Sequence, residues 1–234
     1  MTRQKVAVVT GVGPGTGVAI TKRLVQDGYV VAMIARDASR LSQFSAEIPG
    51  AYSYAGDVSD QKFLLDALDR IESELGAPEV LVHNAVGGAF GSFLEVDSKI
   101  LEDNFKVNVT SLLVASKRLA PTMIDLGKGA IIVTGNTSAW RGKSKFAAFA
   151  PTKAAQRILA ESIARELAPK GIHVSYLTID AVIDVPWARK RYPDAEDDFF
   201  IKPEIIASEV IHLINQPSGG WSFNAELRPY KEIW

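Results

Sequence analysis

A glycine-rich stretch near the start of the chain has the residue types that bind phosphate groups. It reads TGVGPGTG over residues 10–17 and carries glycine at positions 11, 13, 15 and 17. Glycine lets the backbone approach a ligand closely, and the first turn of a following helix offers free N–H groups. Thr16 stands where the third glycine of G-x-G-x-x-G would be, so the pattern is T-G-x-x-x-G-x-G instead. We expect this loop to bind the pyrophosphate of a dinucleotide.

Polar side chains also follow the fifth apolar run of the chain. The stretch TGNTSAWRG offers Asn136, Thr137 and Ser138 directly after that run. In an open α/β sheet, ligand-binding groups are presented at the carboxyl ends of the strands. Each of the three side chains is therefore a candidate to contact a ligand, and the sequence does not choose between them.

A lysine suited to catalysis lies in FAAFAPTKAAQ, residues 146–156. Lys153 follows Phe149 by one helical turn, so the two side chains share a face of the expected helix. Phenylalanine has no hydroxyl, and the position that would suit a proton donor is therefore inert.

The elements that position these groups alternate along the chain. Short apolar runs typical of buried strands cover residues 5–11, 30–35, 51–58, 79–85, 129–135, 173–179 and 222–229. Helical patterns cover residues 15–29, 37–48, 59–76, 98–126 and 151–168. Ser59 is the expected N-cap of the third helix. The alternation predicts an α/β fold, a doubly wound parallel sheet of the Rossmann type with about seven strands and helices on both faces.

One domain spanning residues 1–234 is the natural interpretation, because no internal repeat or Pro/Gly linker interrupts the alternation. The exception is the segment 184–203, whose dense charges and aromatic residues break the periodicity. A long irregular segment in a compact domain is often a lid over a ligand site. Trp187, Tyr192 and Phe199 would either line a substrate pocket or pack that lid onto the body.

Composition excludes several classes of function. The 234 residues carry a formal net charge of -1, which gives no field to attract nucleic acid or an anionic membrane. There are no cysteines, and the three histidines lie far apart, so we expect no metal site. No apolar run approaches the roughly 20 residues that span a bilayer. The chain enters an apolar strand without a signal-peptide pattern, and we expect a cytoplasmic protein.

In several places the sequence resembles the short-chain dehydrogenase/reductase family, over nearly the whole chain. Thr10, Gly11, Gly15 and Gly17 match its cofactor loop. The remaining matches are Asp57 and Val58 in GDVSD, Asn84 and Ala85 in HNAVG, Asn108 in NFKVNVTS, and Lys153. The resemblance implies that Asp57 and Val58 lie near the adenine, that Asn84 and Ala85 lie beside its ribose, and that Lys153 holds the nicotinamide ribose.

The end of the second strand bears on which dinucleotide binds. An NAD site uses a carboxylate there to bind the ribose 2′-hydroxyl. Here Ala35 occupies the position and Arg36 follows it, with Arg40 one helical turn further. A guanidinium pairs well with a 2′-phosphate. We therefore expect NADP(H) to be preferred over NAD(H).

This sequence departs from the family at its catalytic tyrosine. In the family a tyrosine four residues before the lysine exchanges a proton with the substrate, and the lysine lowers the pKa of that tyrosine. Here Phe149 stands in its place, and an alternative spacing finds only Phe146. The chain therefore resembles a divergent branch with phenylalanine in place of the catalytic tyrosine.

A second departure follows the sixth strand. Ile179 and Asp180 take the place of the Pro-Gly pair of the family. The resemblance makes Val182 the candidate for a backbone contact with the nicotinamide amide. Asp184 stands near the expected pyrophosphate, which its carboxylate would repel.

Two functions fit these residues. In the first, the protein is an NADP(H)-dependent oxidoreductase acting on a small carbonyl, alcohol or activated alkene. Its catalytic groups would be Asn108, Ser138 and Lys153, with Lys153 holding a water that the Asn108 backbone anchors, and Ser138 or Thr137 polarising the substrate oxygen. In the second, the protein binds NADP(H) without catalysis, as a sensor or an assembly partner.

The two long helices carry apolar residues beyond one face, including Leu112, Leu113, Ile158 and Leu159. In the family the corresponding helices form a dimer bundle, often within a tetramer. We therefore expect a homodimer or homotetramer, with a small molecule as the substrate.

Overall fold

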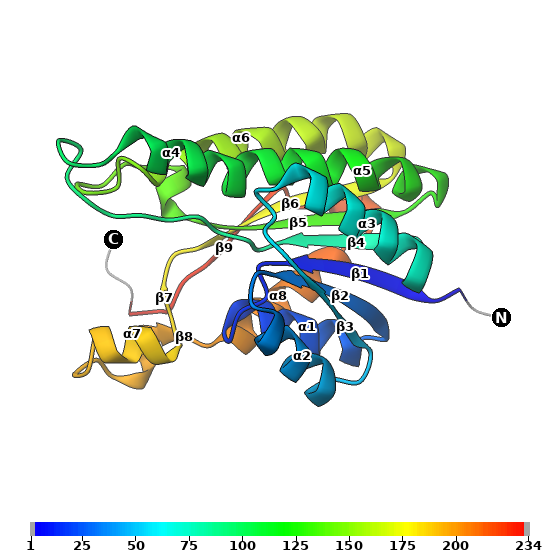
Figure 1. Ribbon diagram of the computed structural model, residues 1–234, viewed down its shortest axis with the longest axis horizontal. Coiled ribbons are helices and arrows are strands. Elements are labelled where there is room, and N and C mark those ends of the chain that lie inside the picture. Colours follow the sequence, from blue (N-terminus) through cyan, green and yellow to red (C-terminus); the bar gives the residue numbers. More distant parts are fainter. Residues whose placement is uncertain (1–2, 232–234) are drawn as a thin grey trace.

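The structure is built on a seven-stranded parallel sheet with helices on both faces (Figure 1). The computed structural model describes residues 3–231. The strands are β1 (Lys5–Thr10), β2 (Tyr29–Ala35), β3 (Ala51–Ala55), β4 (Pro78–His83), β5 (Gly129–Asn136), β6 (Ile172–Ile179), β7 (Val182–Ile183), β8 (Phe200–Ile201) and β9 (Asn224–Leu227). The α-helices are α1 (Thr16–Gln26), α2 (Ala38–Glu47), α3 (Gln61–Leu75), α4 (Ser98–Phe105), α5 (Ser111–Asp125), α6 (Ala150–Leu167), α7 (Pro186–Arg191) and α8 (Pro203–Ile214).

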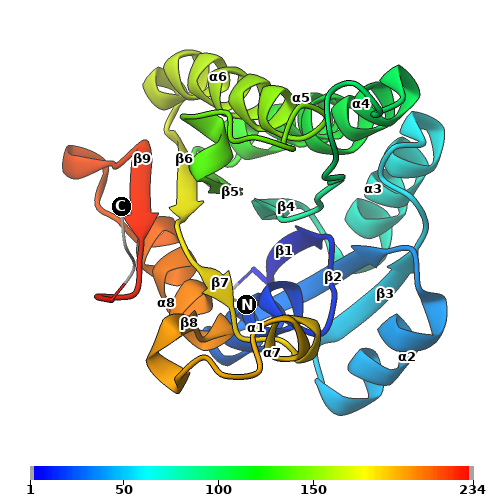
Figure 2. The same cartoon turned by 90° about the vertical axis from the view of Figure 1, so that its left-hand side faces the viewer.

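The strand order in the sheet is β3-β2-β1-β4-β5-β6-β9, which confirms the predicted doubly wound fold. Helices α1, α2 and α8 cover one face, and α3, α5 and α6 cover the other (Figures 1 and 2). Each face has its own apolar core, because the buried strands present Val, Ile, Leu and Ala to both sides. The order reverses between β1 and β4, which is where such sheets open a crevice for a ligand.

The long helix expected over residues 98–126 is interrupted. Between α4 and α5, residues Lys106–Thr110 form one π-helical turn. The extra residue of this turn directs Asn108 inward, where it is fully buried. Single π turns of this kind are frequently found at functional sites.

The structure corrects three expectations about the elements. The N-cap of α3 is Asp60 rather than Ser59, since the Asp60 carboxylate accepts hydrogen bonds from the Lys62 and Phe63 amides. Helix α8 was not anticipated from the sequence. It begins with Pro203 in its first turn. It buries Ile206, Val210 and other apolar side chains in the core on the face of the sheet that α1 and α2 cover.

The third correction concerns the segment 184–203, which is more regular than expected. It contains α7 and ends in β8, which pairs in parallel with β7. Tyr192 packs on Phe199 at 5.3 Å between ring centroids, and Phe199 packs on Phe200 at 5.0 Å. These rings pack within the segment itself, whereas Trp187 is 67% exposed. None of the helices in residues 3–231 has the length and apolar character needed to cross a bilayer.

Gly135 on β5 provides a test of the packing between neighbouring strands. A Cβ atom at this position would lie 2.1 Å from Cζ of Tyr176, a fully buried side chain on β6. We expect Gly135→Ala to lower the free energy of unfolding by about 1–3 kcal/mol, because the ring has to shift within a filled core. Gly219→Ala is the matched control, because nothing lies within 4 Å of its added Cβ. Equal urea-unfolding midpoints for the two variants would contradict this account.

Candidate functional site

Two of the cavities in residues 3–231 bear on the site, and the larger opens at the carboxyl ends of β1, β2 and β4 with a volume of about 2040 Å³. Its walls come from the glycine loop, the end of β2, the loops after β3 and β4, and the segment that leads into α7. Nine of the residues predicted to bind a cofactor line it: Gly11, Gly15, Thr16, Gly17, Arg36, Asp57, Val58, Asn84 and Ala85.

The glycine loop needs glycine at two positions. Gly11 has a φ of +72°, and a Cβ there would lie 2.5 Å from Cα of Ala85. A Cβ on Gly17 would lie 2.7 Å from the Gly11 carbonyl oxygen. The loops after β1 and β4 therefore touch through their backbones at Gly11, where any side chain would separate them. A side chain at Gly17 would instead clash with the backbone of the glycine loop itself.

Helix α1 presents its N-terminus to this cavity. The N-cap is Gly15, and no side chain caps the helix. Thr16 and Gly17 of its first turn line the cavity. Uncapped N–H groups and the positive end of the helix dipole favour an anion at this place, so the loop fits a pyrophosphate.

Thr10 acts behind the cavity wall rather than in it. Its Oγ1 accepts hydrogen bonds from the Asn84 amide at 3.2 Å and the Ala85 amide at 3.3 Å. The Asn84 side chain donates to the Gly11 carbonyl at 2.9 Å and accepts from Thr134 Oγ1 at 3.0 Å. Thr10 and Asn84 thereby fix the two loops that form the floor of the cavity.

The end of β2 presents two arginines and a carboxylate to the cavity. Arg36 is exposed, and no ion pair to it is present among residues 3–231. The sequence suggested that no acid stands here, but Asp37 lines the cavity as well. Asp37 caps α2 by accepting from the Arg40 amide, and its other oxygen lies 3.0 Å from the Arg40 guanidinium. The negative charge is thus offset locally, and Arg36 is the cation left to meet a ligand.

The loop after β3 contributes Asp57 and Val58 to the cavity wall. Asp57 accepts a hydrogen bond from the Ser59 amide at 2.9 Å, and Val58 is buried. An apolar side chain next to a fixed carboxylate suits the face and edge of a purine base.

Asn108 does not line either cavity but holds the loop after β4. Its side chain accepts from the Gly87 amide and donates to the Gly87 carbonyl, both at 2.8 Å. It also donates to Thr152 Oγ1 on α6 at 2.8 Å. These bonds join the π turn, the loop and α6, and Asn108 is therefore a positioning residue in this geometry.

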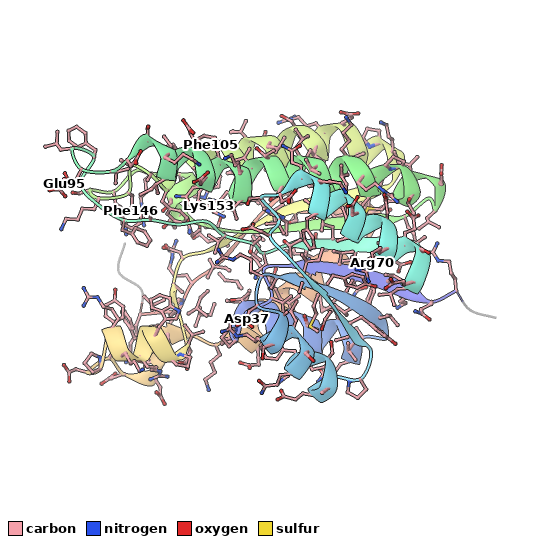
Figure 3. All side chains as sticks on the ribbon, in the orientation of Figure 1. Asp37, Arg70, Glu95, Phe105, Phe146 and Lys153 are labelled. Carbon is pink, nitrogen blue, oxygen red and sulfur yellow. The ribbon has the colours of Figure 1, made fainter. Side chains whose placement is uncertain are left out.

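Lys153 is almost fully buried and lines neither cavity in the described residues. Its Nζ donates to the Thr134 carbonyl at 3.2 Å and to Oε1 of Gln156. Gln156 in turn donates to the Asn108 carbonyl at 2.7 Å. Figure 3 shows Lys153 on the sheet side of the helical layer. The backbone carbonyl expected to anchor a lysine-bound water thus accepts a hydrogen bond from Gln156.

His83 is buried in the same region. It shares hydrogen bonds with Thr10 Oγ1 and Ser111 Oγ. Burial, with a smaller contribution from the charge of Lys153, lowers the pKa of His83 to about 3. The imidazole is therefore neutral at physiological pH and serves to link β1, β4 and α5.

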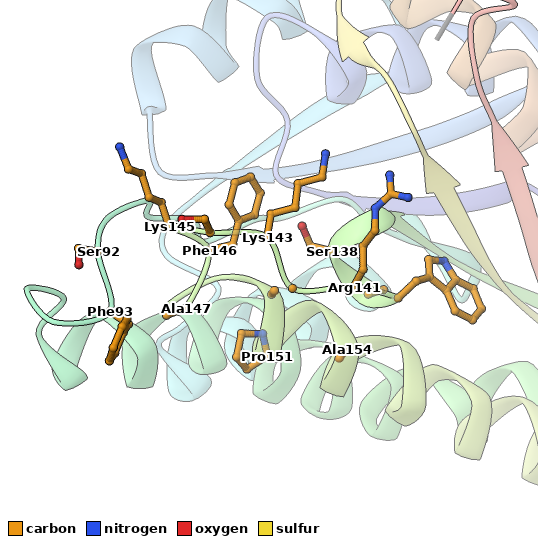
Figure 4. Close-up of a pocket in the computed structure, with 15 residues that line it drawn as sticks. Ser92, Phe93, Ser138, Arg141, Lys143, Lys145, Phe146, Ala147, Pro151 and Ala154 are labelled. Carbon is orange, nitrogen blue, oxygen red and sulfur yellow. The ribbon is translucent and has the colours of Figure 1, made fainter. Parts of the chain in front are cut away.

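The second cavity is smaller, at about 640 Å³, and Ser138 lies in its wall (Figure 4). Asn136 and Thr137 do not line it. The Asn136 side chain accepts from the Ser138 amide at 3.0 Å, and the Thr137 carbonyl accepts from the Trp140 amide. Of the three candidates after β5, Ser138 is the one whose hydroxyl faces a cavity.

Three phenylalanine rings pack together beside the smaller cavity, which Phe146 lines. Phe90 lies 4.8 Å from Phe146 and 5.6 Å from Phe149 between ring centroids. Phe149 is buried, and a Cβ on Gly88 would lie 3.5 Å from its ring. The ring therefore lies behind the loop after β4, with no hydroxyl to offer.

The segment after β6 differs from its expected roles. Val182 pairs with Phe200 in the small sheet and does not line either cavity, whereas Ile183 and Val185 line the larger one. The Asp184 carboxylate lies 2.7 Å from Nε and 2.7 Å from Nη2 of Arg189. These bonds lower the pKa of Asp184 and neutralise the charge that was expected to repel a pyrophosphate.

Sequence reasoning missed Gln156 and a run of cations after β5. Gln156 follows Lys153 by three residues on α6, a spacing that makes side chains neighbours. Arg141, Lys143 and Lys145 alternate in the stretch RGKSK, and all three line the smaller cavity. The alternation was visible, but its position beside Ser138 depends on the turn that follows β5.

Comparison with known proteins places these features in context. The family model described as short chain dehydrogenase matches residues 5–194. D-erythrulose reductase of Gallus gallus is 32% identical over 174 residues, covering 74% of this chain and 69% of that protein.

Solved structures agree. A short-chain dehydrogenase from Rhodopseudomonas palustris superposes with a TM-score of 0.84 at 28% identity, covering 97% of this chain and 100% of that one. A metagenomic short-chain oxidoreductase in complex with NADP superposes with a TM-score of 0.84 at 27% identity, covering 96% and 97%.

The burial of Lys153 has a measurable consequence. Desolvation lowers its pKa from 10.5 to about 7. Between these values the unfolded chain binds the proton and the folded chain does not, so the free energy of unfolding rises with pH across this window. Relative to Lys153→Met, we expect the wild type to gain stability from pH 7 to 9, at most about 1.4 kcal/mol per pH unit.

Urea unfolding at several pH values measures the difference. Lys22→Met, at an exposed lysine of α1, controls for the loss of one charge. Parallel stability curves for the wild type and Lys153→Met would show that the amine titrates as it does in water, and would contradict the buried geometry.

Proposed function

The chain belongs to the short chain dehydrogenase family, and from this premise we propose that it is an NADP(H)-dependent oxidoreductase acting on a small carbonyl, alcohol or activated alkene. The observation that carries the proposal is the larger cavity, where an uncapped helix N-terminus and an unpaired guanidinium line one space. The NADP bound to the metagenomic relative supports the choice of cofactor.

The residues present fit this cofactor. Because Gly11 and Gly17 have no side chains, the loop packs closely on itself and on the loop after β4, and the N-terminus of α1 stays open to a pyrophosphate. Arg36 suits a 2′-phosphate, and Asp57 with Val58 suits the adenine. When bound, the cofactor supplies the hydride for reduction.

The chain's own groups then orient the substrate. Ser138 donates a hydrogen bond to the substrate oxygen, because its hydroxyl faces the smaller cavity. Asn108 holds Gly87 in position through two hydrogen bonds and so keeps the loop after β4 against α6. The buried Phe149 ring packs on Phe90 and Phe146 and makes one side of the site apolar.

In this proposal Phe149 replaces the proton donor of the family. Loss of a general acid slows a reaction by about 10²–10⁴-fold but leaves the positioning of the reactants intact. Reduction of an activated alkene tolerates this loss best, because the proton can come from solvent.

A second function is favoured by the position of Lys153. Its amine is enclosed by Thr134 and Gln156 and lines neither cavity in the described residues. A lysine held in this way has its hydrogen bonds within the protein and would have to exchange them to hold a ligand. The alternative is therefore a catalytically silent protein that binds NADP(H) as a sensor or assembly partner.

We also propose that the chain acts as one domain, with the segment 184–203 as a lid, because Val185, Trp187 and Lys190 line the larger cavity. The exposed Leu113 on α5 and Ile158 on α6 favour assembly into a homodimer or homotetramer. A cytoplasmic location stays a prediction from the sequence.

Arg36 tests the choice of cofactor. We expect Arg36→Ala to weaken NADPH binding by about tenfold, since one charge-assisted contact to the 2′-phosphate is lost. NADH binding should change little. Arg40→Ala is the matched control and should have a smaller effect, because Asp37 already pairs with its guanidinium. Calorimetry that finds equal affinity for both cofactors, or no loss in Arg36→Ala, would refute the preference.

Turnover is tested by NADPH oxidation over a panel of ketones, aldehydes and activated alkenes, with Phe149→Tyr assayed in parallel. We expect the wild type to reduce at least one activated alkene, and the variant not to improve that reaction. If the wild type binds NADPH but reduces nothing while the variant gains ketone reduction, the silent-binding alternative holds instead.

A further inference from the structure

We propose that the smaller cavity binds the anionic group of the substrate, so that the protein acts on a molecule with an apolar body and a carboxylate or phosphate monoester. The inference rests on the proposed function only in taking this ligand to be the substrate. The loop Arg141–Lys145 would hold the anion.

The cavity has the size and walls of a small-molecule site. Its volume of about 640 Å³ lies within the range of roughly 300–1,000 Å³ found for ligand pockets. Phe93, Trp140 and Phe146 supply aromatic walls, and Ser138 supplies the hydroxyl. The indole of Trp140 is held in place, because the Arg157 guanidinium stacks 3.9 Å from its ring and its Nε1 donates to Thr178.

The charged residues that line the cavity are all positive. Its 15 residues include the cations Arg141, Lys143 and Lys145 and no carboxylate. Figure 4 shows the three cationic side chains extending to the same side as the Ser138 hydroxyl. An anion placed among them would meet positive charge with no acidic neighbour in the wall to oppose it.

Two of these cations have no local partner. Lys143 and Lys145 make no ion pair with any residue in 3–231. Arg141 is 3.9 Å from Asp180, but that carboxylate is already bonded by Arg228 at 3.0 Å. The positive charge of the cluster is therefore not neutralised within the protein and can pair with a ligand. Arg189 differs, because Asp184 and Asp197 both form ion pairs with it.

The backbone of the loop favours the same interpretation. Lys145 is the one non-glycine residue of the described chain with a positive φ, at 68°. Its carbonyl accepts from the Gly91 amide at 2.9 Å, and the Phe146 amide donates to the Lys143 carbonyl at 3.1 Å. Glycine or asparagine would suit this conformation with less strain. A lysine in a strained position at a cavity wall is typical of a ligand clamp.

The anion is not a phosphate of the cofactor. No described residue lines both cavities, and the larger one has its own cation in Arg36 and its own helix N-terminus. The cations of the loop Arg141–Lys145 are therefore available for the other reactant.

Binding of matched probes to the cofactor-free protein gives the first test. The probes are 4-formylbenzoate, 4-formylphenyl phosphate and the neutral methyl 4-formylbenzoate, titrated by calorimetry. We expect at least one anion to bind roughly tenfold more tightly than the ester, with the advantage falling as salt is added. The stronger of the two anions identifies the carboxylate or the phosphate as the natural group.

The double variant Lys143→Gln/Lys145→Asn assigns the effect to the loop, since asparagine tolerates the left-handed backbone. The anion-to-ester ratio should fall towards one in this variant and stay at the wild-type value in Lys22→Gln. Equal binding of acid, phosphate and ester by the wild type, or an unchanged ratio in the double variant, would overturn the proposal.

NADPH oxidation with the same three aldehydes separates the two claims. If the wild type binds an anion selectively but oxidises no NADPH with these aldehydes or with the activated alkenes, the anion site stands and the oxidoreductase function is ruled out. If the wild type reduces the ester as efficiently as both anions, the oxidoreductase function stands and the anion site is ruled out.

Discussion

The close approach of the loops after β1 and β4 determines where this molecule can bind a ligand. At Gly11 and Ala85 the two backbones meet with no room for a side chain. Thr10 and Asn84 fix that contact with hydrogen bonds in both directions across the boundary. The strand order reverses at the same place, and the larger cavity opens above this contact, at the carboxyl ends of β1, β2 and β4.

A buried polar layer then connects this floor to the helices above it. Lys153, Gln156 and Asn108 form a chain of hydrogen bonds from the carbonyl of Thr134 on β5 to the loop after β4. Every member is satisfied inside the protein, which makes such a network rigid. The same hydrogen bonds keep the Lys153 amine away from both cavities. The contacts that hold Lys153 inside the protein therefore oppose the binding of a nicotinamide ribose, the role that the resemblance implies for this lysine.

Sequence periodicity was sufficient for the sheet, because the central strands β1, β4, β5 and β6 are buried on both faces and read as continuous apolar runs. It failed where an apolar helix follows a charged segment, and α8 was missed for that reason. The nine cavity residues were found because glycine spacing and strand ends are local features. The direction of the Lys153 side chain was not found, since it depends on Gln156 and on a carbonyl of β5 that is distant in the chain.

The π turn at Lys106–Thr110 places one more residue in this helical region than an uninterrupted α-helix would hold. Because the wide turn absorbs one residue, deleting that residue would restore an ordinary α-helix and leave α5 in its present register. Leu112, Leu119 and Met123 would stay in the core, whereas Asn108 would lose its place opposite Gly87. The surplus residue therefore serves the loop after β4 rather than the packing of the helix, and a lineage could lose it and still keep the fold.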